Sequence, residues 1–148
     1  MPSIRLADAA AHFKRSAAAL RANLLSSEAA TLKEAKAQAL LFSSGTLSTA
    51  TLRRMGHPYA VRNPTAPDPG TINAQTGVFR AAFTSSPPSA SGGSITSSVV
   101  NNSKVAGYLA NGTRFMIARP LAVKVQIAVQ SARLTRTRRA VAKAFTQP

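Results

Sequence analysis

An apolar stripe along residues 4–42 constrains the fold more than any other feature of this sequence. In a helix, at about 100° per residue, its first five members fall within about 60° of one another. The stripe consists of Leu6, Phe13, Ala17, Leu20 and Leu24, and it continues through Thr31, Ala35 and Phe42. Ser26 and Ser27 offer a second N-cap, so the segment forms either one helix or two. In both cases we expect an amphipathic helical arm over residues 1–43.

The segment from Leu121 to Phe145 fits two patterns. Its first residues alternate between β-branched and other side chains, as in a strand, over residues 123–130. Read as a helix, the whole segment gathers its large apolar side chains within about 40° of one another. These are Val123, Ile127, Leu134, Val141 and Phe145. We favour the helix, because one register accounts for the entire segment and Pro120 suits its first turn.

A basic face accompanies this C-terminal helix (residues 119–148). It consists of Arg133, Arg136, Arg139 and Lys143. We expect the apolar stripe to be buried on a sheet or on a neighbouring subunit. The basic face would then be exposed to an anionic partner, which is either DNA or an acidic protein.

Glycine and proline divide the loop-rich segment at residues 44–75. Gly45 is a plausible helix stop, and a short helix is predicted from Leu47 to Met55. Four prolines then punctuate the stretch Pro58–Gly70, which is too long for an ordinary connection and is typical of functional or interface loops.

Residues 76–118 are predicted to form a small antiparallel sheet. The candidate strands are Val78–Thr84, Ser94–Asn101 and Lys104–Ala110, and Ser85–Gly93 is predicted to be a flexible hairpin loop. The sequence therefore predicts an α+β fold in which the N-terminal and C-terminal helices pack on this sheet, with long Pro/Gly/Ser-rich loops. A length of 148 residues fits one domain.

The charge of the chain is strongly unbalanced. It has 19 Lys and Arg against 4 Asp and Glu, a formal net charge of +15, and none of the acids lies beyond Asp68. Such a field attracts polyanions, either nucleic acid or an acidic protein surface. Much of the 45% apolar share is alanine, so we expect a thin core and dependence on partner subunits.

The sequence offers little for catalysis. The four carboxylates are scattered, and His12 and His57 lie in different elements with no third ligand at metal spacing. No phosphate-binding or dinucleotide-binding glycine motif is present, and cysteine is absent. We therefore expect no catalytic residues, no metal, no cofactor and no enzyme activity. No apolar run is long enough to span a membrane, and we expect the protein to be made in a cytoplasm.

Two motifs occur in a recognisable order. The first is Q-T-G-V-F-R-A-A-F at residues 75–83, and the second is Y-L-A-N-G-T at residues 108–113, followed by M-I-A-R-P-L at residues 116–121. They resemble the D-T-G-x-L-R-x-S-I and Y-x-x-x-L/V-E-F/x-G-T … A-R-P-F-L patterns of the neck, or tail-completion, proteins of long-tailed bacteriophages. Gln75 stands where that family has an acid, Asn111 stands near its glutamate, and Leu121 replaces its phenylalanine.

The resemblance implies a structural virion protein located at the head–tail junction or in the tail. It implies a homo-oligomeric ring of about six subunits, which joins head to tail around the DNA channel. The adjoining connector and tail proteins would be its partners, together with packaged DNA through non-specific phosphate contacts, and no membrane is involved. A tail-terminator ring fits the same resemblance. A small non-specific basic DNA-binding protein is the alternative from another class.

The matched motif residues are candidates for fold or interface roles. They are Thr76, Gly77, Phe79, Arg80, Tyr108, Gly112, Thr113, Ala118, Arg119 and Pro120. Independently of the resemblance, Gly77 and Gly112 mark places where a Cβ does not fit or where φ is positive. Arg119-Pro120 should end the sheet and start the C-terminal helix, because a residue before proline is pushed out of the α region.

Overall fold

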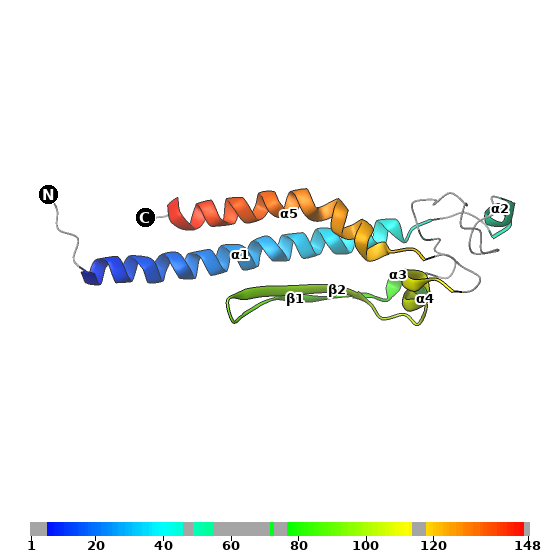
Figure 1. Cartoon of the computed structure of the whole chain (residues 1–148), viewed down its shortest axis with the longest axis horizontal. Coiled ribbons are helices and arrows are strands. Elements are labelled where there is room, and N and C mark those ends of the chain that lie inside the picture. The colour runs from blue at the N-terminus through cyan, green and yellow to red at the C-terminus, as the bar shows by residue number, and fades with distance from the viewer. Residues whose placement is uncertain (1–5, 46–48, 55–71, 73–76, 114–117, 147–148) are drawn as a thin grey trace. The chain divides into compact units, whose positions relative to one another are not determined.

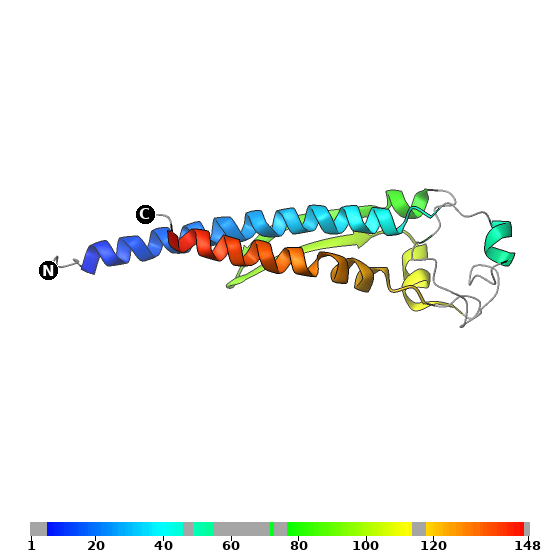
Figure 2. The ribbon, with the colours of Figure 1, turned by 90° about the horizontal axis from the view of Figure 1, so that it is seen from above.

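The computed structural model of the chain describes residues 6–45, 49–54, 72, 77–113 and 118–146 (Figure 1). In chain order its elements are α1 (Leu6–Phe42), α2 (Thr49–Arg54), α3 (Val78–Ala81), β1 (Phe83–Ser91), β2 (Ser94–Asn101), α4 (Val105–Asn111) and α5 (Leu121–Thr146). Helices α1 and α5 pack together and on the two-stranded antiparallel sheet β1-β2 (Figures 1 and 2). The predicted α+β class is confirmed.

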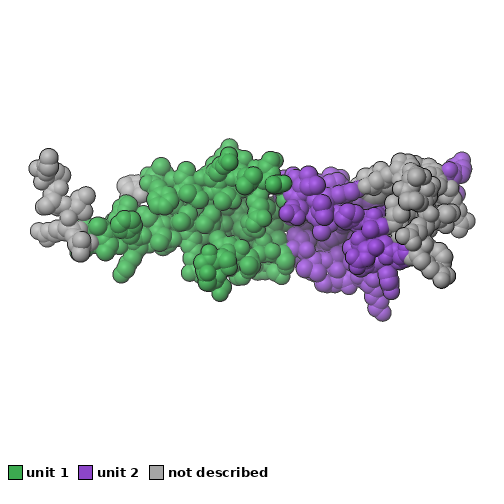
Figure 3. All heavy atoms as spheres, in the orientation of Figure 1, with its two compact units in different colours: residues 1–33, 86–98, 129–148 green, residues 34–85, 99–128 purple. Residues whose placement is uncertain are grey.

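Two compact units divide the chain, and Figure 3 shows them in separate colours. Unit 1 takes its described residues from 1–33, 86–98 and 129–148, and unit 2 takes its own from 34–85 and 99–128. Each unit therefore contains a part of α1, a part of the β-hairpin and a part of α5.

The buried core of the described residues is small. Its apolar members are Ala39, Ile72, Phe83, Leu109, Val129, Ala140 and Ala144. Three of these seven are alanines, which agrees with the thin core that the composition predicts. Such a core supplies little hydrophobic stabilisation, because the apolar area removed from water sets that contribution.

Helix α1 runs without a break through Ser26 and Ser27, so the alternative of two helices is wrong. The Ser27 carbonyl accepts a hydrogen bond from the Thr31 hydroxyl at 3.0 Å, one turn further along the helix. Glu28, which follows Ser27, interacts with other elements instead of with a helix N-terminus. The helix ends at Phe42, near the glycine that predicts its stop.

The predicted strand Val78–Thr84 is wrong over its first residues, which form helix α3. Gly77 precedes this single turn with φ 73°, and its carbonyl accepts the Ala81 N–H at 2.9 Å. The Asn101 side chain donates a hydrogen bond to the Phe79 carbonyl at 2.7 Å. Phe79 also meets Phe83 edge-to-face, with ring centroids 5.4 Å apart. The sequence of this turn by itself favours a strand. These contacts from outside the turn stabilise the helical conformation instead.

The prediction of a flexible loop at Ser85–Gly93 is also wrong. Strand β1 continues through Pro87 and Pro88 to Ser91, and the hairpin turns at Gly92 and Gly93, whose φ values are 55° and 81°. Two consecutive positive φ values are typical of the tight turns that join antiparallel strands. The prediction for Ser94–Asn101 is confirmed as β2, whose half-buried residues alternate along the strand.

The third predicted strand, Lys104–Ala110, is helix α4 in the structure. The Asn101 side-chain oxygen accepts the Ser103 N–H at 3.0 Å, a local bond that turns the chain directly after β2. Leu109 is the buried residue of α4, and its carbonyl accepts the Arg119 N–H at 2.7 Å. The predicted sheet at residues 76–118 is therefore a two-stranded hairpin flanked by two short helices.

Residues 121–146 form α5, so the helical interpretation is confirmed and the strand alternative is wrong. The Pro120 carbonyl accepts N–H groups from Val123 at 3.1 Å and Lys124 at 3.3 Å, which places the proline at the start of the helix as predicted. The short helix expected at Leu47–Met55 corresponds to α2, while the predicted loop Pro58–Gly70 lies outside the described residues. None of the described helices has the length and apolar character needed to cross a membrane.

Candidate interaction surface

Within unit 1, the face of α5 that points into the fold consists of small residues. Ala144 is 1% exposed, and Ala140 and Val129 are also buried. The Asn23 side chain of α1 donates a hydrogen bond to the Ala140 carbonyl at 3.4 Å. A contact between a side chain of one helix and the backbone of the other requires the two helices to lie close together, and alanine permits such an approach.

Polar contacts reinforce the same side of α5. Arg133 forms an ion pair with Glu28 of α1, in which Arg133 Nε lies 3.4 Å from Glu28 Oε2. The other Glu28 oxygen accepts the Ser97 hydroxyl of β2 at 2.9 Å, so this carboxylate links three elements of unit 1. Arg136, which is half-buried, donates a hydrogen bond to the hydroxyl of buried Thr31 at 3.4 Å.

The predicted basic face of the C-terminal helix is therefore divided. Arg133 and Arg136 contact α1 of their own chain, whereas Arg139 and Lys143 are exposed. Arg136 is half-buried, and the side chain of Arg133 is 55% exposed but paired with Glu28; contact of all four residues with an external anion stays a prediction.

A different side of α5 carries the apolar stripe recognised in the sequence, which we call the outer stripe. Its members are Val123 (51% exposed), Ile127 (67%), Leu134 (52%), Val141 (39%) and Phe145 (64%). At about 100° per residue, Val129 and Ala140 point about 140° and 120° away from the centre of this row, and Ala144 points about 80° away from it. The helix therefore has two apolar faces, an inner one of small residues and an outer one of large residues.

The expectation that this stripe is buried on the sheet is wrong. The inner face takes the position against the rest of the chain because its small side chains allow α1 to approach. The larger side chains remain on the surface of the subunit. The other half of the expectation, burial on a neighbouring subunit, stays a prediction.

The first motif has a structural role at its glycine and at its aromatic residue. Gly77 has φ 73°, and a Cβ there would meet nothing within 4 Å, so the backbone conformation and not lack of space favours glycine. Phe79 contacts Phe83, whereas Arg80 is exposed. Thr76 lies outside the described residues.

The second motif is brought together by α4 and the chain before α5. Gly112 has φ 73°, as predicted, but it ends a helix instead of a strand. Arg119 is buried, with 7% of its surface exposed, and its backbone is bonded to Leu109. Thr113 is half-buried, and three further positions are exposed and available to a partner, namely Tyr108, Ala118 and Pro120.

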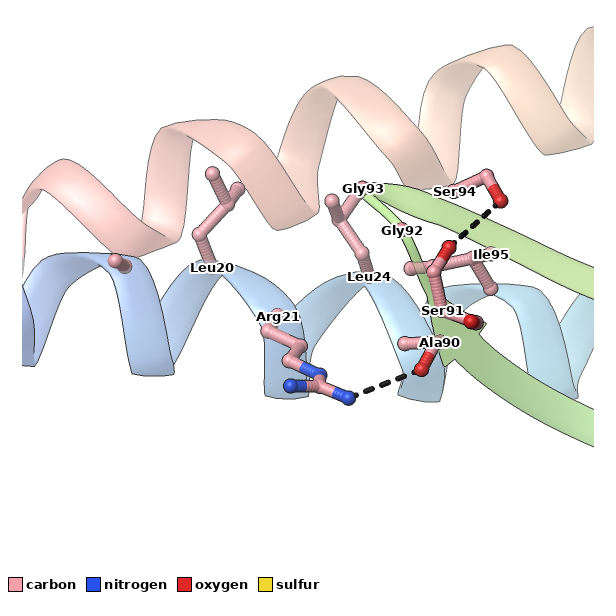
Figure 4. Close-up of a pocket in the computed structure, with 10 residues that line it drawn as sticks. Leu20, Arg21, Leu24, Ala90, Ser91, Gly92, Gly93, Ser94 and Ile95 are labelled. Atoms are coloured by element: carbon pink, nitrogen blue, oxygen red, sulfur yellow. Dashed lines mark hydrogen bonds between the residues drawn. The ribbon is translucent and has the colours of Figure 1, made fainter.

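An open pocket of about 280 Å³ lies within unit 1, between α1 and the tip of the hairpin (Figure 4). Leu20, Leu24 and Ile95 line it, with Gly92 and Gly93 of the turn. Arg21 closes one side by donating a hydrogen bond to the Ala90 carbonyl at 3.1 Å. The pocket is mostly apolar, and it suits packing better than the orientation of a polar ligand.

No three His, Cys, Asp or Glu side chains of the described residues gather into a group that could hold a metal ion. Comparisons with protein-family models, with curated proteins and with solved structures gave no match to this chain.

Sequence reasoning did not identify Glu28 or Ser97 as contact residues. The available signal was the scarcity of acids: Glu28 is one of four carboxylates in a chain with 19 basic residues, so a nearby basic partner was to be expected. The partner itself lies 105 residues away in the sequence, and the pattern of residues does not reveal it.

Proposed function

We propose that this chain is a structural virion protein of a tailed bacteriophage, a subunit of a ring that joins head to tail around the DNA channel. The outer stripe of α5 is the observation that carries the assembly role, and the two motifs at residues 75–83 and 108–121 suggest the location.

The balance of apolar side chains supports an assembly role. The described residues expose eleven large apolar side chains but bury only four, namely Ile72, Phe83, Leu109 and Val129. Five of the exposed ones lie in one row on α5. At roughly half exposure each, they present on the order of 500 Å² of apolar surface, which is as large as the largest patch on a typical monomer and is often functional.

The net charge of +15 fits the same role, since a ring around a DNA channel meets packaged DNA or acidic surfaces of adjoining proteins. In this proposal about six copies form the ring, and the exposed motif residues Tyr108, Ala118 and Pro120 are candidates for its contacts.

Deletion of the gene from the phage genome that carries it tests the proposal. A joining ring is needed only for the last step, so we expect DNA-filled heads and tails of normal length that remain separate in electron micrographs. Tails of abnormal length would instead favour a tail-terminator ring. Complete, infectious particles without the protein would contradict both roles.

The net charge also favours a second candidate, a small non-specific DNA-binding protein. In that case the isolated chain should bind duplex DNA of any sequence, with an affinity that falls steeply and linearly in a plot of log K against log salt. The engagement of Arg133 and Arg136 with α1 leaves fewer basic groups on α5 for such binding. A shallow slope with weak affinity would exclude this candidate.

A further inference from the structure

We infer that Asn111 is a site of spontaneous modification, at which the side-chain amide is converted to aspartate and isoaspartate through a cyclic imide formed with Gly112. The inference concerns the exposed end of α4 and does not rest on the proposed function. It identifies a position at which the surface of the protein changes chemically with time and without an enzyme.

Asn111 and Gly112 supply every protein atom that the reaction needs. The backbone nitrogen of Gly112 attacks the side-chain carbonyl carbon, Cγ, of Asn111. A bond forms between these two atoms, the bond from Cγ to the amide nitrogen breaks, and this nitrogen leaves as ammonia with the proton of the Gly112 N–H. Water then opens the imide at either of its two carbonyls. One opening gives aspartate, and the other gives isoaspartate, in which the main chain runs through Cγ.

Glycine at position 112 favours this attack, because no side chain hinders the approach of its nitrogen. Of the six asparagines in the chain, only Asn111 precedes a glycine. Asn111 is exposed, and Gly112 has already left the helical conformation, with φ 73° and ψ −179°. The dipeptide therefore combines the most reactive neighbour with an accessible side chain.

The end of α4 controls access to the reaction. Asn111 is the last residue of this helix, and a helical backbone keeps its Cγ away from the next nitrogen, so the last turn has to open first. Helix α4 has seven residues, one of which is Gly107, and the two residues after buried Leu109 are exposed. Such a short helix is marginal by itself, and helix ends open at little cost in free energy.

Hydrogen bonds protect the two asparagines that follow β2. The nitrogen that would attack Asn101 belongs to Asn102, and it donates to the Ala82 carbonyl at 3.0 Å. The nitrogen that would attack Asn102 belongs to Ser103, and it donates to the Asn101 side-chain oxygen at 3.0 Å. The Asn101 amide is held further by its bond to the Phe79 carbonyl at 2.7 Å. Neither asparagine can form the imide until these bonds break.

Asn23 is protected by its place in the interior of α1. The attacking nitrogen there would be that of Leu24, in a helix that continues without a break from Leu6 to Phe42. The Asn23 side chain also donates to the Ala140 carbonyl at 3.4 Å. Among the asparagines that the structure describes, Asn111 is therefore the reactive one, and the others are internal controls.

The products alter the surface beside Tyr108. Tyr108 and Asn111 are three residues apart on α4, so their side chains are neighbours on the helix surface, and both are exposed. Conversion replaces a neutral amide by a carboxylate, which is unfavourable at the C-terminal end of a helix. Isoaspartate also lengthens the main chain directly after the turn that Leu109 anchors. Because ammonia is lost, the change is not reversed, and it records the age of the molecule.

The test follows the full chain during incubation near neutral pH. Digestion with trypsin separates the described asparagines into peptides 22–33, 81–104 and 105–114. Acidic products of 105–114 should accumulate about tenfold faster than those of the other two, in which a hydrogen bond has to break first. Chromatography with mass spectrometry should show isoaspartate in excess of aspartate, because direct hydrolysis gives aspartate alone. Equal rates in the three peptides, or aspartate as the single product, would overturn the inference.

Two variants of α4 test whether its opening controls the rate. Gly107→Ala leaves the reacting dipeptide unchanged and should slow conversion of Asn111 about two- to fivefold, since alanine favours the helix over glycine. Ala110→Gly, at an exposed position of the same helix, should accelerate conversion by a similar factor. An identical rate in both variants and in the original chain would contradict the role given to the opening of α4.

Ser103→Gly separates the effect of structure from that of the dipeptide. It places a glycine after Asn102 and keeps the backbone N–H that Asn101 accepts. In the folded chain Asn102 should still react about tenfold more slowly than Asn111, whereas in concentrated urea the two should react at the same rate. Circular dichroism checks that the variant is folded. Equal rates in the folded chain would show that the dipeptide alone decides, and would overturn the structural argument.

Discussion

Glu28 and Arg133 form an ion pair between α1 and α5, and the same carboxylate accepts a hydrogen bond from Ser97 of β2. The Glu28 side chain is 16% exposed and that of Arg133 is 55% exposed, so water screens the pair only in part. This single carboxylate connects all three layers of unit 1.

Replacement of Glu28 by Ala should lower the free energy of unfolding by about 1–2 kcal/mol, mainly through loss of the charged hydrogen bond to Ser97. The screened pair with Arg133 adds at most about 1 kcal/mol. Urea titration gives this value if the slope m is unchanged. Arg133→Gln provides the control for net charge: it lowers the charge of the chain, whereas Glu28→Ala raises it. Stabilisation by Arg133→Gln would show that overall repulsion outweighs the local pair.

Ala144→Leu should destabilise the chain by about 1–3 kcal/mol, because a larger side chain at a site that is 1% exposed forces α5 away from its neighbours. Ala142→Leu is the matched control, since Ala142 is exposed on the same turn and leucine is also a good helix former. The comparison is the difference in urea midpoint between the two variants. Equal midpoints would mean that the inner face is not closely packed.

Leu134→Ala should change the free energy of unfolding of the isolated subunit by no more than about 0.5 kcal/mol, as is usual for surface positions. Val129→Ala, on the buried inner face, should cost about 1–3 kcal/mol. Thermal and urea unfolding of both variants test this contrast. If Leu134→Ala proved the more harmful change in the monomer, the assignment of inner and outer faces would have to be exchanged.

Gly93→Ala should cost about 1–2 kcal/mol, because its φ of 81° places a Cβ against the backbone. Gly107→Ala in α4 should have the opposite sign and stabilise by about 0.5–1 kcal/mol, since Gly107 has no positive φ and nothing lies within 4 Å of the added Cβ. Hydrogen exchange of the β-hairpin amides should become faster only in the Gly93 variant. Faster exchange in both would indicate a general loss of stability instead of a turn effect.

The parts of the fold that could be predicted are those with a long, regular pattern. Helix α5 was predictable to within one residue because a single register and Pro120 define it, and β2 was predictable because its half-buried residues alternate. Val78–Ala81 was not, since its helical turn depends on the Asn101 side chain, which lies 22 residues from its acceptor. Strand β1 was missed because Pro87, Pro88 and the serines around them have little strand character until β2 pairs with them.

The residues of the candidate surface could be predicted from the sequence. Whether they face the core or the solvent could not. Periodicity identified the row of large apolar side chains on α5, and such a row is usually placed against the core. Alanine contributes little to that pattern, so Ala140 and Ala144 gave no sign that their own face of the helix would be the buried one. The distinction depends on how closely α1 approaches, which is a property of the folded chain.

The ion pair between Glu28 and Arg133 also has a consequence for synthesis, because the two residues are 105 positions apart. At about 5–20 residues per second, roughly 5 to 20 s pass on the ribosome after Glu28 is made before Arg133 exists. During that interval α1 lacks the helix against which it packs, although its own hydrogen bonds can already form. Helix α1 therefore gains its packing partner only after α5 has been made. Any factor that shields α1 has to remain bound until translation has reached α5.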